Sequence, residues 1–375
     1  MIKILTAFTV FFIPFTGVLT VANGISTALF SAPFLILISS LKYINRRILS
    51  FVFYTLTFYT YGLFLILINS MFYEWTWHII IMPTILFAIF YFLSIHGSTK
   101  YFEKVLRITF FVVITFGCFE FLVANYFGVN LISLYVSDTN YQPIGHFGLI
   151  RARSVFPESG HFSLFIIFYM LYKLKGGSNL SHLEQLFGSV GVILSGSSAG
   201  MVCLFLFFTY FGIRKGRKFN SGLFFISFFG SLLVIPFLLA ALVDETIRKI
   251  NSISFLERLN SSAEYYGVMK DFDFITGLAP GFYHQYPYEP PIGIIQIIYF
   301  SYGLVGLSVY LGFLLKRMWI RQDILLSLLS ILVVTFCHLT YGGYYYFFAW
   351  LPFFANKNCS PKSSFVRVFE KEKPE

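Results

Sequence analysis

Long runs of apolar residues, separated by short polar segments, make up most of the chain. The apolar residues follow one another without the alternation of period two that is typical of strands, and this favours helices. A helix that crosses a membrane needs about 17–25 largely apolar residues. The pattern therefore predicts an all-α polytopic membrane protein with about 12 transmembrane helices, at residues 4–22, 25–41, 48–69, 78–95, 105–125, 161–173, 182–195, 198–213, 222–243, 292–315, 324–340 and 341–355. The sixth, seventh, eighth and twelfth of these are short, and we expect them to extend into the flanking polar residues.

Composition supports the same class of protein. Of the 375 residues, 57% are hydrophobic and 12% are charged, whereas a soluble domain carries about 25% charged residues. A compact soluble protein and a disordered chain are both excluded. We expect one integral membrane domain over residues 1–355 and a charged cytoplasmic tail over residues 356–375.

The net charge of +10 is explained by membrane topology and needs no nucleic acid as a partner. Lysine and arginine concentrate in the cytoplasmic loops of membrane proteins. If the N-terminus is cytoplasmic, the basic residues fall on the inner side in every second connection, and the C-terminus is cytoplasmic as well. The exceptions on the outer side are Arg151, Arg153, Arg248, Lys249, Arg258 and Lys270.

Two long segments, at about residues 125–160 and 244–291, face outward in this topology and contain all of these exceptions. Loops longer than about 12–15 residues in compact proteins are usually functional or disordered, and the aromatic content of both segments favours order and function. The second segment begins with apolar residues at three-residue spacing, which predicts a short helix on the outer membrane surface or a packed lid helix. These residues are Ile247, Ile250, Ile253, Leu256 and Leu259.

The strongest candidate for a binding site is the sequence from Arg151 to His161, at the start of the sixth predicted span. Two arginines two residues apart offer a fork of donors for phosphate oxygens, although they could equally anchor to lipid headgroups. Glu158 lies where a carboxylate caps a helix N-terminus; alternatively, it orients Arg153 or contacts a substrate.

Three weaker features follow along the chain. The small-residue turn at 195–200 indicates close helix packing by default, or close approach to a ligand. Glycine and proline at 277–281 mark a tight turn, and the aromatic residues at 283–288 suit either stacking on sugars or an interfacial belt. Glu120 and His338 are ionisable groups inside predicted spans, which is a functional signal in membrane proteins.

Taken in order, these features resemble the O-antigen polymerase and ligase superfamily. The sequence R-x-x-x-x-F-x-E-x-G occupies 151–160, followed by Ser195-Gly-Ser-Ser-Ala-Gly200, an arginine, Gly277-x-x-Pro-Gly281, and a span that contains Tyr302-Gly303-x-x-Gly306. The resemblance covers about residues 145–315. It implies a membrane-embedded glycosyltransferase of the GT-C-like type.

The resemblance implies an inverting, metal-independent enzyme without a cofactor. A Wzy-type polymerase transfers a growing polysaccharide from undecaprenyl diphosphate to the next lipid-linked repeat unit, so undecaprenyl-diphosphate-linked oligosaccharide is both donor and acceptor. Such a protein lies in the bacterial inner membrane, with its active site on the periplasmic side. A chain-length regulator and a flippase are further partners that this biology suggests, beside membrane lipid.

The resemblance also implies roles for individual residues. Arg151, Arg153 and Arg258 would bind the diphosphates, and arginines there would stabilise the charge that grows on the leaving group. Glu158, His161 and His284 are the candidates for a base that activates the acceptor hydroxyl.

Two other functions remain as alternatives. Ligases of the superfamily carry His-Asn shortly before the Gly-x-x-Gly span, where this chain has Ile292-Gly293, and this favours the polymerase. A flippase for lipid-linked sugars would fit the number of spans, but the internal symmetry typical of transporters is not visible. The cysteines lie in apolar runs or in the tail, without the spacing of a metal or disulfide site.

Overall fold

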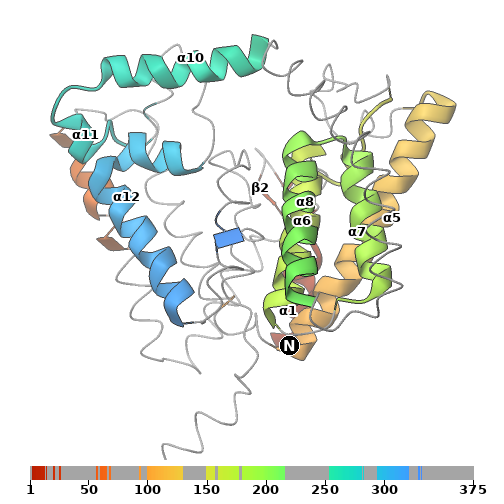
Figure 1. Cartoon of the computed structure of the whole chain (residues 1–375). Coiled ribbons are helices and arrows are strands. Elements are labelled where there is room, and N and C mark those ends of the chain that lie inside the picture. Colours follow the sequence, from red (N-terminus) through yellow and green to blue (C-terminus); the bar gives the residue numbers. More distant parts are fainter. Residues whose placement is uncertain are drawn as a thin grey trace, which may run out of the picture.

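The computed structural model describes residues 2–12, 14, 20–21, 25–26, 56–57, 60–65, 67–68, 93, 99–129, 149–156, 159–176, 180–215, 253–280, 282, 294–320, 328–329 and 331. This part of the chain is predominantly helical, as the sequence predicts (Figure 1). Its helices are α1 (Ile2–Phe12), α5 (Lys100–Phe127), α6 (Ser159–Gly176), α7 (His182–Ser195), α8 (Ser198–Lys215), α10 (Ile253–Val268), α11 (Asp273–Thr276) and α12 (Ile294–Ile320).

Helices α5 to α8 form a bundle in which successive helices run in opposite directions, and α1 packs against α5. At one end, Lys173 near the end of α6 contacts Glu103 near the start of α5. At the other end, the segment that follows α5 bonds to Leu194 near the end of α7. We call the first the basic end and the second the motif end.

The lengths of α5 and α7 follow from local capping signals. Thr99 caps α5 by accepting a hydrogen bond from the amide of Phe102, and the helix stops at Gly128, whose φ is +65°. Ser181 and Glu184 form a capping box at the start of α7, and Gly196, with φ of +56°, ends it. Such caps satisfy backbone groups that a helix end leaves without partners.

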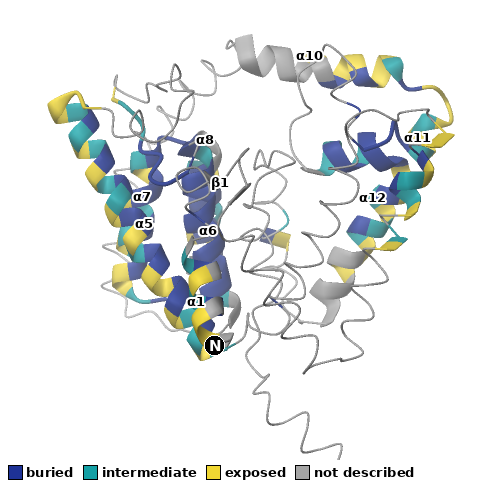
Figure 2. Ribbon diagram, turned by 180° about the vertical axis from the view of Figure 1, so that it is seen from behind, coloured by how far each residue is buried: buried dark blue, intermediate teal, exposed yellow. Residues whose placement is uncertain are grey.

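Helix α6 lies at the centre of the bundle. Every side chain from His161 to Lys173 is buried, as Figure 2 shows by its dark colour. A helix that is apolar all round requires this environment. Small residues let its neighbours approach: a Cβ on Gly191 of α7 would lie 2.6 Å from Cδ1 of Ile166, and a Cβ on Gly200 of α8 would lie 2.5 Å from Oγ of Ser163.

A buried carboxylate ties three helices together at the basic end. Glu184, with a side chain only 1% exposed, lies 3.2 Å from Nε of Arg107 and 3.9 Å from Nζ of Lys173. Tyr169 donates its hydroxyl to the same carboxylate, and Ser181 donates both its amide and its hydroxyl. Pairing of this kind is what allows a charge to be buried among apolar helices.

The second group of described helices consists of α10, α11 and α12. Helix α10 lies along the top of the molecule in Figure 1, above α11 and α12 and at the same end as the motif end of the bundle. Helix α12 is broken at Gly303, whose φ of +61° and ψ of −163° are not helical. The part of α12 before Gly303 therefore runs in a different direction from the part after it (Figure 1).

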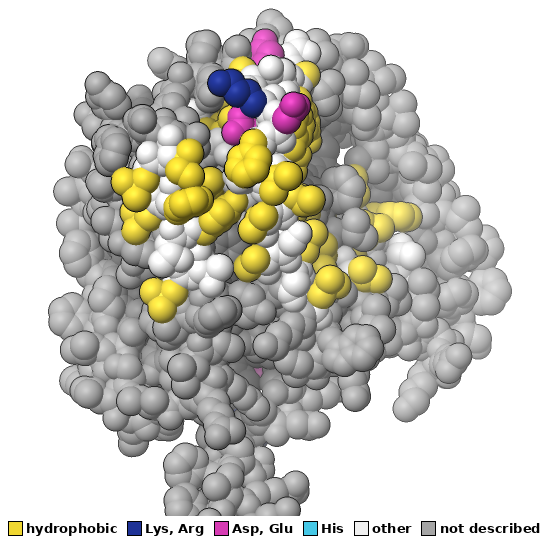
Figure 3. Space-filling view, turned by 90° about the vertical axis from the view of Figure 1, so that its left-hand side faces the viewer, with side chains coloured by type: hydrophobic (Ala, Val, Ile, Leu, Met, Phe, Trp, Pro, Cys, Tyr) yellow, Lys and Arg dark blue, Asp and Glu magenta, His cyan; other side chains and the backbone are white. Residues whose placement is uncertain are grey.

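Two of the described helices are long and apolar enough to cross a membrane, by length and composition alone: Lys100–Phe127 and Ile295–Gly312. The first has 28 residues and spans about 42 Å. Large apolar side chains are exposed on its surface and on α7, including Ile108, Phe119, Leu186 and Ile193. Figure 3 shows the opposite side of the molecule, where α10, α11 and α12 lie; most of the coloured charged side chains there are near the top, with apolar ones below them.

Several predicted spans can be compared with the structure. Helices α6 and α8 extend beyond the predicted 161–173 and 198–213, as expected, whereas α7 keeps the predicted bounds 182–195 and has only 14 residues. Helix α10 begins at Ile253 and continues to Val268, beyond the predicted amphipathic stretch.

The first predicted span, 4–22, is wrong as a continuous helix. Helix α1 ends at Phe12, and β1 (Thr20–Val21) pairs antiparallel with β2 (Ile25–Ser26). β-branched residues favour strands, and the intervening sequence contains Asn23-Gly24, a strong hairpin signal. The spans at 25–41 (beyond β2), 222–243 and 341–355, nearly all of 78–95, and the tail at 356–375 lie outside the described residues.

Candidate functional site

Residues 149–156, between α5 and α6, form the segment that carries Arg151 and Arg153; we call it the arginine segment. One side of it is bound to α7, because the amide of Ala152 donates to the carbonyl of Leu194 at 2.9 Å. The other side is bound to Asn125 of α5. Its Oδ1 accepts from the amide of Ile150 at 2.7 Å, and its Nδ2 donates to the carbonyl of Ile150 at 3.0 Å.

A carboxylate from α5 holds the middle of the arginine segment. Oε2 of Glu120, a residue only 3% exposed, accepts the amides of Arg153 at 2.9 Å and Ser154 at 2.5 Å. The sequence singles out Glu120 as an ionisable group in a predicted span, but it does not indicate the connection with the arginines. Its partners are backbone amides, which leave no signal in a sequence.

Ser154 adopts a backbone conformation that residues with side chains rarely take, with φ of +56°. Its Oγ donates to the carbonyl of Val113 at 2.6 Å. This close approach to α5 depends on Gly117, where a Cβ would lie 3.2 Å from Cβ of Ser154 and 2.7 Å from Cζ of Phe162. The bend of the arginine segment is therefore fitted against α5.

The structure brings Arg151 against the small-residue turn between α7 and α8. A Cβ on Gly196 would lie 3.1 Å from Cγ and 3.3 Å from Nε of Arg151. Arg153 is 7% exposed, and His161, in the first turn of α6, is 4% exposed. Two motifs that lie about 45 residues apart in the sequence are thus in direct contact, while Gly200 of the same turn serves helix packing.

The remaining predicted site residues divide into two groups. Arg258 lies in α10, which in Figure 1 is at the same end of the molecule as the arginine segment, on the side of α11 and α12. Glu158 and His284, the other candidates for a base besides His161, lie outside the described residues. In the described ranges, no group of three or more His, Cys, Asp or Glu residues could hold a metal ion.

The glycine-proline turn and the glycine span form one unit. The amides of Leu278 and Ala279 donate to the carbonyls of Phe300 and Ser301, at 2.7 and 3.1 Å. These carbonyls are available because the break at Gly303 interrupts the helical hydrogen bonding of α12. The turn therefore docks into the break in α12.

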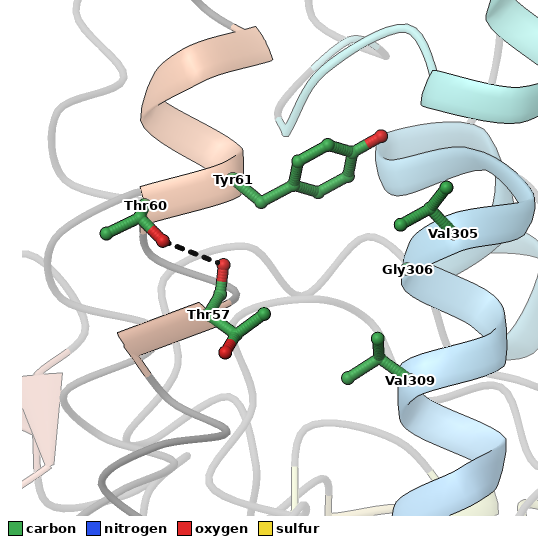
Figure 4. Close-up of a pocket in the computed structure, with 6 residues that line it drawn as sticks. All are labelled: Thr57, Thr60, Tyr61, Val305, Gly306 and Val309. Carbon is green, nitrogen blue, oxygen red and sulfur yellow. Dashed lines mark hydrogen bonds between the residues drawn. The ribbon is translucent and has the colours of Figure 1, made fainter.

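A third element packs against this unit. Tyr61, in the helical turn at residues 60–65, donates its hydroxyl to the carbonyl of Thr276 at 3.0 Å. Between this element and α12 lies a cavity of about 330 Å³ (Figure 4), near the lower limit for small-molecule pockets. It is lined by Thr57, Thr60, Tyr61, Val305, Gly306 and Val309.

The walls of this cavity are mainly apolar, because the hydroxyls that Thr60 and Tyr61 contribute are bonded to backbone carbonyls. No sequence signal predicts this cavity, since its threonines and tyrosine form no recognisable motif. No protein-family model matches the chain, and no curated protein matches it.

Proposed function

We propose that the chain is a membrane-embedded glycosyltransferase, a polymerase that transfers a polysaccharide from undecaprenyl diphosphate to the next lipid-linked repeat unit. The observation that carries the proposal is the contact between the arginine segment and the turn at 195–200. Two motifs of the resemblance meet at one end of an apolar bundle, where a substrate with its tail in lipid presents its diphosphate.

The proposed chemistry needs positive charge at the leaving group. As the bond between the sugar C1 and the phosphate oxygen breaks, negative charge grows on the lipid diphosphate. Fixed donors at that oxygen lower the barrier, because they need no reorganisation during the reaction. Arg151 and Arg153 are the donors on the arginine segment, and Arg258 is the third, from α10.

An acceptor hydroxyl attacks C1 from the opposite face and inverts the configuration at that carbon. The proton that it loses goes to a base, for which Glu158, His161 and His284 are the candidates. The reaction takes place at the periplasmic face of a bacterial inner membrane, which corresponds to the motif end. Flippases and chain-length regulators are the partners that this role would have.

The test uses purified protein in nanodiscs with undecaprenyl-diphosphate-linked repeat units. Folded wild-type protein should produce a ladder of lipid-linked products, and Arg151→Ala and Arg153→Ala should each slow it by about 100-fold or more. Lys270→Ala is the matched control, because Lys270 is an exposed basic residue in the second long segment and outside the motifs. It should keep the wild-type rate.

Three results would reject the polymerase or replace it with another function. Folded wild-type protein that makes no ladder rejects the polymerase. Transfer of the sugar to a different acceptor identifies the ligase branch, and movement of the lipid-linked sugar across liposomes without transfer identifies a flippase.

A further inference from the structure

Glu120 stands out among the described ionisable groups because its contacts lead to the arginine segment. It lies near the C-terminal end of α5, and its carboxylate accepts two consecutive backbone amides, those of Arg153 and Ser154. Hydrogen bonds to a carboxylate are stronger than those between neutral groups. In an apolar surrounding, with Glu120 only 3% exposed, they are not weakened by water.

Helix α5 makes two further attachments to this segment. Asn125 bonds to both backbone groups of Ile150, and Ser154 bonds to the carbonyl of Val113 through its hydroxyl. Residues 150, 153 and 154 are therefore bound to one helix. Glu120 supplies two of these bonds, and they bind the backbone amides at the bend itself.

The bend needs such support. Ser154 has φ of +56°, a strained conformation that persists only where the surroundings impose it. If the amides of residues 153 and 154 lost their acceptor, the peptide between them would be free to rotate toward an ordinary conformation. Arg153 would then be displaced with its backbone, and Arg151, two residues before it, would move from its position beside Gly196.

We infer that Glu120 is a positioning residue, which holds the arginine segment so that its two guanidinium groups meet the lipid diphosphate. The inference rests on the proposed function. Glu120 does not touch the substrate; it acts through the backbone that carries the arginines. Its role differs from that of Glu103, a second carboxylate of α5, which pairs with Lys173 at the basic end.

Three variants separate positioning from simple stability: Glu120→Ala, Glu120→Gln and Glu103→Gln. The alanine variant removes the acceptor, whereas the glutamine variant keeps a neutral oxygen that can accept both amides. Per folded molecule, Glu120→Ala should lower kcat about 100-fold, as expected for a displacement of about 1 Å at a catalytic group, with a smaller change in KM. Glu120→Gln should recover most of the rate, and Glu103→Gln should keep it entirely.

Hydrogen–deuterium exchange provides a readout that does not depend on activity. The amides of residues 153 and 154 should exchange faster in Glu120→Ala than in wild-type protein, and should not change in Glu103→Gln. If the alanine variant does not fold, the glutamine variant gives the comparison, with faster exchange at the same two amides because its acceptor is neutral.

The outcomes are distinguishable. A wild-type protein without a ladder rejects the proposed function, while the exchange comparison still decides whether Glu120 holds the segment. Unchanged exchange in the Glu120 variants overturns the inference, and so does an unchanged kcat per folded molecule in Glu120→Ala when wild-type protein is active. A loss of rate in Glu103→Gln equal to that in Glu120→Ala would also overturn it, because the effect would then be general destabilisation.

Discussion

The docking of the turn at 277–280 into the break of α12 makes a sharp prediction about Gly303. A Cβ at this position would lie 2.2 Å from the carbonyl oxygen and 2.4 Å from the carbonyl carbon of Ile275. Both are backbone atoms, which cannot move aside as a flexible side chain can. The backbone of Gly303, with φ of +61° and ψ of −163°, is also in a region that only glycine occupies readily.

Gly303→Ala should therefore destabilise the protein through two effects. The strained conformation costs about 1–3 kcal/mol, and the overlap with Ile275 costs about 1–3 kcal/mol more through displacement of the turn. The sum is about 2–6 kcal/mol. At about 2 °C per kcal/mol, the melting temperature should fall by about 4–12 °C.

Gly312→Ala is the matched control, because Gly312 lies in the same helix and a Cβ there would have nothing within 4 Å. It should leave stability unchanged or raise it by up to about 1 kcal/mol, the difference in helix propensity. Thermal unfolding in detergent, followed by tyrosine and tryptophan fluorescence, measures both variants. Equal melting temperatures for the two would refute the docking of the turn into α12.

Four further substitutions test other contacts by the same measurement. Gly191→Leu should lower stability by about 1–3 kcal/mol, because it would push Ile166 and α6 away from α7; a neutral effect would contradict this packing. Glu184→Ala should cost about 3–5 kcal/mol, the usual loss when one partner of a buried ion pair is removed, and chemical denaturation provides an independent check. Ser301→Ala should be neutral or stabilising, since Ser301 Oγ is buried without a hydrogen-bond partner in the described part of the chain. Ser154→Ala should lower the free energy of unfolding by about 1 kcal/mol, because it removes a buried hydrogen bond. If both serine substitutions were destabilising, the hydrogen bonding assigned to the two serines would be wrong.

Helix positions were predicted well where apolar length decides the structure. Helix α7 has the predicted bounds, and α6 and α8 differ from theirs by a few residues at their ends. The prediction of the first span, 4–22, was wrong because average hydropathy over a window does not detect the residues that favour a hairpin turn. Thr20, Val21 and Ile25 are apolar enough for a span and β-branched enough for a strand.

The candidate site was predictable only in part. Paired arginines in a segment predicted to face outward are visible in a sequence, and so is a lone acid such as Glu120 in an apolar run. The contact between Glu120 and the arginine segment cannot be predicted from the sequence, because Glu120 binds backbone amides, which are present at almost every residue. The contact between Arg151 and Gly196 follows from the direction of α7, which returns the chain to the motif end.

Backbone strain marks two of the segments that carry the sequence motifs. Among the described residues, two that are not glycine have positive φ: Ser154 at 56° and Ala279 at 90°. One lies in the arginine segment and the other in the turn docked into α12, and each is bound by hydrogen bonds to a long helix. Strained residues persist only where the surroundings impose them, and they gather at functional sites. For the proposed transfer, the donors on the arginine segment are therefore fixed before the lipid diphosphate arrives, and donors fixed in advance stabilise developing charge most effectively.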